Sequence, residues 1–271
     1  MSLSESESPI AARSGVESAW ARLRVEAAAA AAEEPILASF LNAAVLRHDH
    51  FAHALAYRLA SKLADAQLDM MLARDVAEAA LEGDTKIVEQ AAADMMAVEE
   101  RDPACRSFLQ PFLYFKGYHA LQAHRVAHWL WGEGRETLAF HLQSRVSERF
   151  GVDAHPAARI GQGVMIDHAT SVVIGETAVI GDDCSLLHEV TLGGTGAAHE
   201  DRHPKVGRGV LIGAGAKVLG NIEIGDGARI AAGSVVLKPI PAGCTVAGVP
   251  AKIVGDCCPQ PARSMDQRLP D

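Results

Sequence analysis

The sequence predicts an α+β protein in which an all-helical N-terminal domain is followed by a parallel β-helix. The main observation is a six-residue interval between aliphatic residues in the C-terminal half, unbroken through Val206, Ile212, Val218, Ile224, Ile230 and Val236. A glycine follows many of these residues directly. A period of six fits neither the 3.6 residues of a helical turn nor a two-residue strand alternation, and it is typical of hexapeptide β-helices.

The N-terminal half has helical periodicity instead. Leu55, Leu59 and Leu63 recur at four-residue spacing, which places them on one helix face. A second apolar stripe is expected on one helix face, formed by Ile36, Leu37, Phe40, Leu41, Ala44 and Val45. Alanine, the strongest helix former, is abundant here and runs without interruption through 27–32.

Four segments follow from these patterns. Residues 1–14 are rich in Ser, Glu and Ala and are expected to be disordered. The helical domain is expected over 15–150, where it ends as the periodicity changes at Gly151. The β-helix is expected over 151–256, and 257–271 form a polar, flexible tail.

Composition excludes several classes of protein. The chain has 271 residues, 49% of them hydrophobic, and a net charge of −9, whereas nucleic-acid binding needs clustered Lys and Arg. The sequence contains no run of about 18 apolar residues, so we expect no membrane span. The acidic N-terminus lacks the basic segment followed by an apolar segment that marks a secretion signal. The five cysteines form no CxxC pair, and their odd number favours a reducing cytoplasm over a disulfide framework. We expect a cytoplasmic protein that binds neither nucleic acid nor membranes.

The six-residue period is interrupted twice. It shifts by two residues between Val172 and Ile174. Val206 then follows Leu192 by 14 positions, two more than the 12 positions of two repeats. The second interruption predicts a loop over 193–205 that is extruded from the β-helix. Loops held on a rigid scaffold commonly carry binding and catalytic residues.

Residues suited to chemistry gather around these interruptions. His168 follows Asp167 directly, and Asp153 lies roughly one coil earlier. An imidazole oriented by a carboxylate is the usual general base for activating a hydroxyl. In the loop, Arg202 offers a guanidinium that can grip a carboxylate, and His203 follows it. Structural or surface roles for these residues remain open on spacing alone.

Two further interpretations concern ligands. Gly193 and Gly194 would let backbone amides approach a ligand, and small residues on successive coils would leave a groove, although tight turns also need small residues. Alternatively, His155, His168 and His203 could converge on zinc, as in the γ-class carbonic anhydrases, but no short ligand spacing supports a metal site.

The chain resembles the bacterial serine O-acetyltransferases from about residue 16 to residue 256. The segments that carry the resemblance are EEPILASF (33–40), RDPA (101–104), FKGYHALQAHRVAHWLW (115–131), VDAHPAARIGQGVMIDHAT (152–170), GETAVIGDDCSLLHEVTLGGTG (175–196), DRHPKVGRGVLIGAGAKVLGNIEIGDGARIAAGSVVL (201–237) and AGVPAKIVG (247–255). The resemblance implies a left-handed β-helix and acetyl transfer from acetyl-CoA to L-serine, the first step of cysteine biosynthesis. It also implies trimers that pair through their helical domains into hexamers, with active sites between neighbouring β-helices.

The resemblance assigns a role to each candidate residue. His168 would be the general base, Asp153 would orient it, and His203 would support the tetrahedral intermediate. Arg202 would hold the substrate carboxylate, while Asp102 and Asp167 would hold the ammonium group. Acetyl-CoA, with no metal, would bind along the β-helix edge at Gly194, Thr195, Ala214, Ala232 and Lys252.

Partners and alternatives complete these expectations. L-Cysteine would inhibit by occupying the serine site. Relatives that bind O-acetylserine sulfhydrylase use a C-terminal isoleucine, whereas this chain ends Arg268-Leu269-Pro270-Asp271, so we do not expect that complex. The alternative functions are an acetyltransferase for homoserine, a sugar or an antibiotic, a zinc β-helix enzyme, and a regulatory protein without activity.

Overall fold

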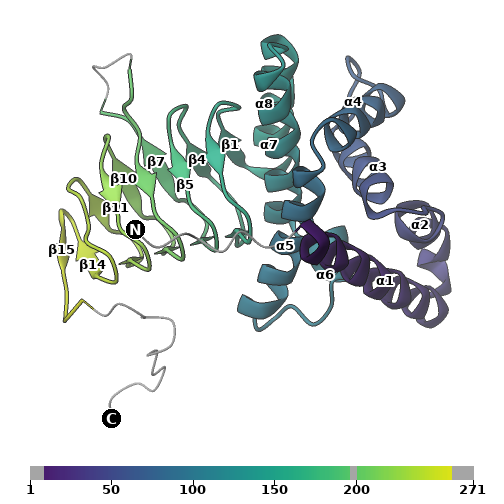
Figure 1. Ribbon diagram of the computed structural model, residues 1–271, viewed down its shortest axis with the longest axis horizontal. Helices are drawn as coiled ribbons and strands as arrows, with labels where there is room; N and C mark the ends of the chain where they lie inside the picture. The colour runs from purple at the N-terminus through teal and green to yellow at the C-terminus, as the bar shows by residue number, and fades with distance from the viewer. Residues whose placement is uncertain (1–8, 196–199, 258–271) are drawn as a thin grey trace. The chain divides into compact units, whose positions relative to one another are not determined.

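The structure is a computed structural model that describes residues 9–195 and 200–257 (Figure 1). The chain divides into two compact units, Met1–Arg145 and Val146–Asp271. The division falls within the last helix, α8 (Glu136–Phe150), and the first strand begins at Val152. Of the two predicted tails, residues 1–8 and 258–271 lie outside the described residues.

The first unit is helical throughout its described part. Its α-helices are α1 (Pro9–Glu33), α2 (Ala38–Leu41), α3 (Phe51–Leu63), α4 (Met70–Gly83), α5 (Lys86–Arg101), α6 (Leu109–Leu113), α7 (Lys116–Gly132) and α8 (Glu136–Phe150). Helix α1 begins within the segment that the sequence predicts as disordered. Helix α7 is buried along most of its length and packs against α4, α5 and α6, so it forms the centre of this unit. None of the described helices combines the length and the apolar character that crossing a membrane requires.

The two predicted apolar stripes have different outcomes. Leu55, Leu59 and Leu63 are buried on α3, which confirms the first stripe. The prediction of a single helix face over Ile36–Val45 is wrong, because the chain changes helix type twice there. A 3₁₀ turn, η1 (Pro35–Leu37), precedes α2, and a π-helical turn, η2 (Asn42–Leu46), follows it. The side chain of Ile36 is therefore 85% exposed, whereas Leu41, Ala44 and Val45 are buried.

The second unit is a parallel β-helix with three faces (Figure 1). Sheet A contains β1 (Val152–Ala154), β4 (Val172–Ile174), β7 (Thr191–Gly193), β10 (Lys217–Leu219) and β13 (Val235–Val236). Sheet B contains β2 (Arg159–Ile160), β5 (Val179–Ile180), β8 (Lys205–Val206) and β11 (Glu223–Ile224). Sheet C contains β3 (Met165–Ile166), β6 (Ser185–Leu186), β9 (Leu211–Ile212), β12 (Arg229–Ile230), β14 (Thr245–Gly248) and β15 (Ala251–Ile253). The chain passes from sheet A to B to C and back to A in each coil.

The strand register explains the six-residue period. In sheet C, Leu186 pairs with Ile166 of the preceding coil and with Ile212 of the following coil. These three side chains stack in one column inside the β-helix. Sheet B has an equivalent column in which Ile180 pairs with Ile160 and Val206. One aliphatic residue per face points inward, so a coil of three faces returns to the same column after three hexapeptides. The predicted hexapeptide β-helix is confirmed.

The C-terminal end of the β-helix differs from the expectation for the cysteines. Cys244 forms a disulfide with Cys257, so the expectation that the cysteines do not form disulfides is wrong for this pair. The reason is local, because β15 turns back antiparallel to β14. The N–H of Val254 donates to the carbonyl oxygen of Thr245, which brings Cys257 back beside Cys244. Cys105 and Cys184 are buried and are not disulfide-bonded.

We predict that the internal column dominates the stability of the β-helix. Leu186→Ala removes a side chain that is 0% exposed and should lower the free energy of unfolding by about 2–5 kcal/mol. Leu211→Ala is the matched control, because Leu211 lies in the next strand of the same sheet but is 37% exposed. Urea unfolding followed by circular dichroism measures both variants. Equal losses in the two variants would contradict a stability that depends on the internal column.

Candidate active site

Two different edges of the β-helix carry four of the predicted site residues, namely Asp167, His168, Arg202 and His203. Asp167 and His168 follow β3, in the turn that leads from sheet C to sheet A. Arg202 and His203 precede β8, in the connection from sheet A to sheet B. Sheet A lies between these edges, and a three-residue strand alone spans about 10 Å. One β-helix therefore carries two separate groups of candidate residues.

The turn that carries His168 has an unusual backbone. His168, Ala169 and Ser171 have positive φ angles of 56°, 59° and 61°, which residues with a side chain rarely adopt. The two-residue shift in the period accounts for His168 and Ala169: Val152 pairs with Val172, twenty residues on, whereas Val218 pairs with Val236, eighteen residues on. Ser171 occupies the turn position at which Glu189, Gly215 and Gly233 also have a positive φ. The extra length is accommodated in this turn. Strained backbone of this kind clusters at functional sites, which supports a functional role for the turn.

His168 itself is accessible. Its side chain is 71% exposed, and its Nε2 lies 3.5 Å from Oδ2 of Asp167. The ring of His188 meets it edge to face, with 5.6 Å between ring centroids. Sequence reasoning missed His188, although a signal was present: it lies twenty residues after His168, the coil length at that point, and Ile166 pairs with Leu186.

The roles predicted for Asp153, which would orient His168, and for Asp102, which would hold the ammonium group, remain predictions. Asp153 is exposed at the centre of β1, between the buried Val152 and Ala154, and its partner in the next coil is Val173. Asp102 belongs to the helical unit, where it caps the C-terminus of α5 and its Oδ1 accepts a hydrogen bond of 2.8 Å from the N–H of Ala104.

Arg202 is held by acceptors on both sides of its guanidinium. Its Nη2 donates to Oε2 of Glu176 at 2.5 Å, and its Nη1 donates to the carbonyl oxygen of Glu200 at 3.2 Å. The hydrogen bond from Arg202 holds the pKa of Glu176 below its usual value. Glu176 is therefore ionised and fixes the direction of the guanidinium, a role that the sequence analysis did not assign to it.

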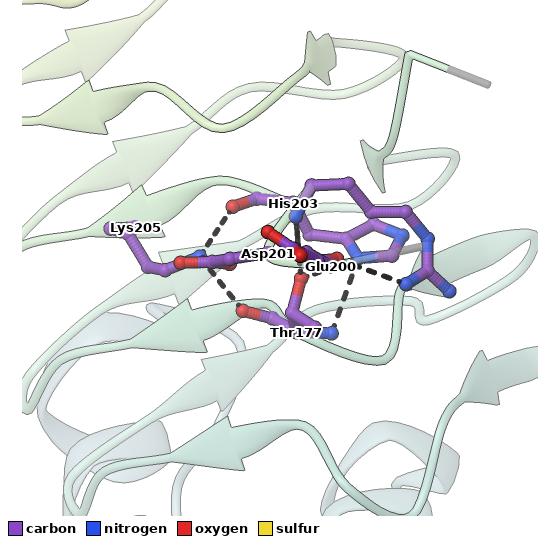
Figure 2. A network of polar contacts seen from close by, with 6 residues as sticks. Thr177, Glu200, Asp201, His203 and Lys205 are labelled. Atoms are coloured by element: carbon purple, nitrogen blue, oxygen red, sulfur yellow. Dashed lines mark hydrogen bonds and ion pairs between the residues drawn. The ribbon is translucent and has the colours of Figure 1, made fainter. Parts of the chain in front are cut away.

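His203 is anchored through Thr177, as Figure 2 shows. The backbone N–H of Thr177 donates to Nδ1 of His203 at 3.2 Å, and the Thr177 hydroxyl lies 2.9 Å from the same nitrogen. In return, the backbone N–H groups of Arg202 and His203 each donate to Oγ1 of Thr177 at 3.1 Å. Thr177 thus replaces the missing strand pairing as the anchor of this connection.

Lys205 fixes the other end of the same connection. Its Nζ donates to Oδ1 of Asp201 at 2.5 Å, to the carbonyl oxygen of His203 at 2.7 Å and to that of Thr177 at 2.9 Å (Figure 2). The ammonium group lowers the pKa of Asp201 through this hydrogen bond. The segment 200–205 is consequently a defined structure, although it interrupts the repeat.

Two glycines make room for the imidazole of His203. A Cβ at Gly175 would lie 2.0 Å from both Cδ2 and Nε2 of His203, and a Cβ at Gly194 would lie 3.3 Å from Nε2. His203 is 7% exposed, and this burial is the main reason that its pKa is lowered, with the charge of Arg202 second. The ring is therefore neutral near pH 7.

The residues predicted to bind acetyl-CoA also divide between the two edges. Gly194 and Thr195 follow β7 on the edge that carries His203. Ala214 and Ala232 lie in successive turns from sheet C to sheet A, on the edge that carries His168, and the N–H of Gly233 donates to the carbonyl oxygen of Ala214. Lys252 is exposed on β15. Among the residues that the structure describes, no three His, Cys, Asp or Glu side chains are grouped so that they could hold a metal ion.

Comparison with known proteins gives consistent matches over almost the whole chain. Residues 19–123 match the family model described as serine acetyltransferase, N-terminal, and residues 203–238 match the bacterial transferase hexapeptide model of six repeats. Serine acetyltransferase from Salmonella typhimurium is 54% identical over 255 residues, covering 94% of this chain and 93% of the relative.

Solved structures agree with the sequence matches. Serine acetyltransferase from Neisseria gonorrhoeae in complex with serine has a TM-score of 0.84 and 55% identity, covering 86% of this chain and 96% of that chain. The enzyme from Brucella abortus in complex with coenzyme A has a TM-score of 0.87 and 48% identity, covering 89% and 96%. A serine acetyltransferase in complex with cysteine has a TM-score of 0.87 and 50% identity, covering 88% and 99%.

A helical domain followed by a β-helix of hexapeptide repeats, with a histidine-bearing segment before β8, defines an acyltransferase of the hexapeptide-repeat class. The β-helix is left-handed, as the resemblance implied. The chain belongs to the serine acetyltransferase family and is an enzyme of the transferase class.

We predict that Gly175 is needed because it leaves space for His203. The Cβ in Gly175→Ala would push the imidazole out of its position, and a displacement of about 1 Å can cost roughly 10²-fold in rate. Gly132→Ala is the control, because a Cβ there meets no heavy atom within 4 Å. Steady-state acetyltransferase assays measure the rate, and circular dichroism shows that both variants fold. Normal turnover in folded Gly175→Ala would show that the position of His203 does not matter.

Proposed function

We propose that this enzyme transfers the acetyl group of acetyl-CoA to the hydroxyl of L-serine, producing O-acetyl-L-serine and CoA. Membership of the serine acetyltransferase family supports this reaction, as do relatives solved with serine and with coenzyme A. The reaction is the first step of cysteine biosynthesis. A free serine presents a carboxylate, an ammonium group and a hydroxyl, and the chain offers a residue of matching chemistry for each.

His168 takes the proton from the serine hydroxyl as the hydroxyl oxygen attacks the thioester carbonyl. The tetrahedral intermediate then expels the CoA thiolate, which recovers the proton from the imidazolium, so the charge and the proton balance over the cycle. The exposure of His168 and the neighbouring Asp167 carboxylate support its role as base. Orientation of His168 by Asp153 rests on the resemblance alone.

The substrate's charged groups have separate partners. Arg202 binds the serine carboxylate, because Glu176 and the carbonyl oxygen of Glu200 fix the direction of its guanidinium, whose planar fork of N–H groups matches a carboxylate. Asp167 and Asp102 bind the ammonium group, an assignment that rests on the resemblance. His203 donates a hydrogen bond to the oxygen of the tetrahedral intermediate.

The single observation that carries this proposal is the division of the site between two edges of one β-helix. His168 with Ala214 and Ala232 lies on one edge, whereas Arg202 and His203 with Thr195 lie on the other. Joining two different patches of identical subunits gives a heterologous contact, which closes into a ring when the rotation allows. A trimer in which one edge faces the other edge of the neighbouring β-helix would complete three sites. Pairing of trimers into a hexamer through the helical units is part of the same proposal.

Regulation and location follow the same reasoning. L-Cysteine carries the carboxylate and ammonium group of serine and would compete for Arg202 and Asp167, and a relative has been solved with cysteine bound. Cytoplasmic location remains a prediction. The expected failure to bind O-acetylserine sulfhydrylase concerns a tail outside the described residues and also remains a prediction.

The reaction is tested by thiol release from acetyl-CoA. We expect release that depends on L-serine and that falls when L-cysteine is added. His168→Ala should lower kcat by about 10²-fold or more, since the general base is lost. His50→Ala is the control, as His50 is exposed on the helical unit. Faster turnover of homoserine, a sugar or an antibiotic would overturn the choice of substrate, and near-normal turnover by His168→Ala would remove it as base.

Subunit complementation tests the divided site. His168→Ala and His203→Ala should each be nearly inactive alone. When they are coexpressed with different affinity tags, each mixed trimer should regain one of its three sites, about one third of wild-type activity, because one contact then combines an intact His168 with an intact His203 from a neighbour. Coexpression of either variant with the double variant is the control and should restore nothing. Inactive mixed oligomers, isolated through both tags, would show that each site lies within one chain.

A further inference from the structure

The protonation of His203 is set by its contact with Thr177. The backbone N–H of Thr177 can only donate, and it points at Nδ1 of His203 at 3.2 Å. Nδ1 must therefore present its lone pair. A neutral imidazole carries one proton, on one nitrogen or the other, so this contact assigns the proton to Nε2.

The Thr177 hydroxyl leads to the same assignment. Its oxygen already accepts hydrogen bonds from the backbone N–H groups of Arg202 and His203, both at 3.1 Å, which occupy its two lone pairs. Its single hydrogen must then be donated, either to Nδ1 of His203 at 2.9 Å or to the carboxylate of Asp201, which also hydrogen-bonds Thr177. Neither arrangement accommodates a proton on Nδ1.

The surrounding charges oppose a second proton on the ring. Arg202 and Lys205 lie on the same connection, and His155 lies after β1, all of which disfavour the imidazolium, while Glu176 after β4 partly opposes them. Burial acts in the same direction as the cations, and the pKa of His203 is lowered as a result.

The protonated nitrogen lies on the side of the ring away from Thr177. Nε2 lies against the glycine-lined surface: the Cβ position at Gly175 is 2.0 Å from both Nε2 and Cδ2, and Nε2 is 3.3 Å from the Cβ position at Gly194. Gly194 begins the stretch predicted to contact acetyl-CoA. A reacting oxygen at this surface would meet an N–H donor that is already oriented, which is the arrangement that stabilises developing negative charge.

We propose that Thr177 is a positioning residue that holds His203 as the Nε2–H tautomer, so that His203 serves as a hydrogen-bond donor to the oxyanion and not as a second general base. The tautomer follows from contacts within this chain, whereas the identity of the oxyanion rests on the proposed function. The proposal separates the two histidines by role: His168 moves the proton, and His203 stabilises charge without changing its own protonation.

The tautomer is tested directly by NMR of protein with ¹⁵N-labelled histidine, without substrate. The His203 signals, assigned by their loss in His203→Gln, should show an N–H on Nε2 and a bare Nδ1 at neutral pH. An Nδ1–H tautomer, or an imidazolium at a pH where the enzyme is active, would overturn the proposal. This measurement needs no variant at Thr177 and does not depend on the reaction.

Matched variants test the positioning role. Thr177→Val keeps the branched shape and removes the hydroxyl, and it should lower kcat by about tenfold with little change in the KM for serine. Thr177→Ser restores the hydroxyl and should restore both kcat and the wild-type NMR pattern. The backbone N–H of Thr177 remains in Thr177→Val, so the Nε2–H tautomer should persist while the ring and its backbone lose the hydroxyl contacts. A folded Thr177→Val with wild-type kcat would refute the role of the hydroxyl. If Thr177→Val fails to fold, a Thr177→Ser protein with an altered tautomer would refute it, and an unaltered one would support it.

His203→Gln separates donor from base. The glutamine amide can donate a hydrogen bond but cannot take up a proton near neutral pH, so this variant should retain more activity than His203→Ala and keep the wild-type pH profile of kcat/KM. If His203→Gln and His203→Ala lose activity equally, and the pH profile of kcat/KM loses the fall in activity at low pH, His203 would be assigned as a base. Absence of serine turnover in the wild type, with the Nε2–H tautomer present, would refute the proposed function and leave the positioning intact.

Discussion

The structure of the catalytic half depends on one constraint, the stacking of aliphatic side chains in internal columns from coil to coil. Each coil is short, so the columns and the parallel backbone hydrogen bonds between coils are its main sources of stability. Because the register is fixed at every strand, every turn is also stacked on the turn below it. His168 and His188 meet edge to face for this reason, since the strands that precede them are paired at Ile166 and Leu186.

The same constraint explains why the candidate site residues His168, Arg202 and His203 lie where the period breaks. A turn that follows the period has no freedom, whereas two extra residues force His168 and Ala169 into the left-handed backbone region and expose the imidazole. In the larger interruption before β8, the described residues 200–204 belong to no strand. They are anchored instead by polar contacts, in which Thr177 and Lys205 satisfy the backbone of residues 202 and 203. These contacts preserve the geometry of Arg202 and His203 without contributing to the internal column.

The three stacked sheets of the β-helix also hold its edges apart. Side chains on the edge between sheets C and A cannot reach those on the edge between sheets A and B, because sheet A is packed against the internal column. For a family that acts on a small amino acid, the proposed trimer resolves this separation by bringing the two edges of different copies together. Assembly and activity would then depend on the same surfaces, and the electrostatic environments of His168 and His203 can differ although both serve one reaction.

The sequence by itself determined the hexapeptide period, the interruption of that period before Val206, and the resemblance that leads to the family. These features are local or repetitive, so they can be read along the chain. Tertiary structure decided the exposure of Ile36, the disulfide between Cys244 and Cys257, and the roles of Thr177 and His188. Thr177 and His203 are 26 residues apart in the sequence. Nothing in the residues around Thr177 reveals that its backbone N–H will donate to an imidazole. The tautomer of His203 depends on hydrogen-bond directions between such distant residues, which only the folded coils establish.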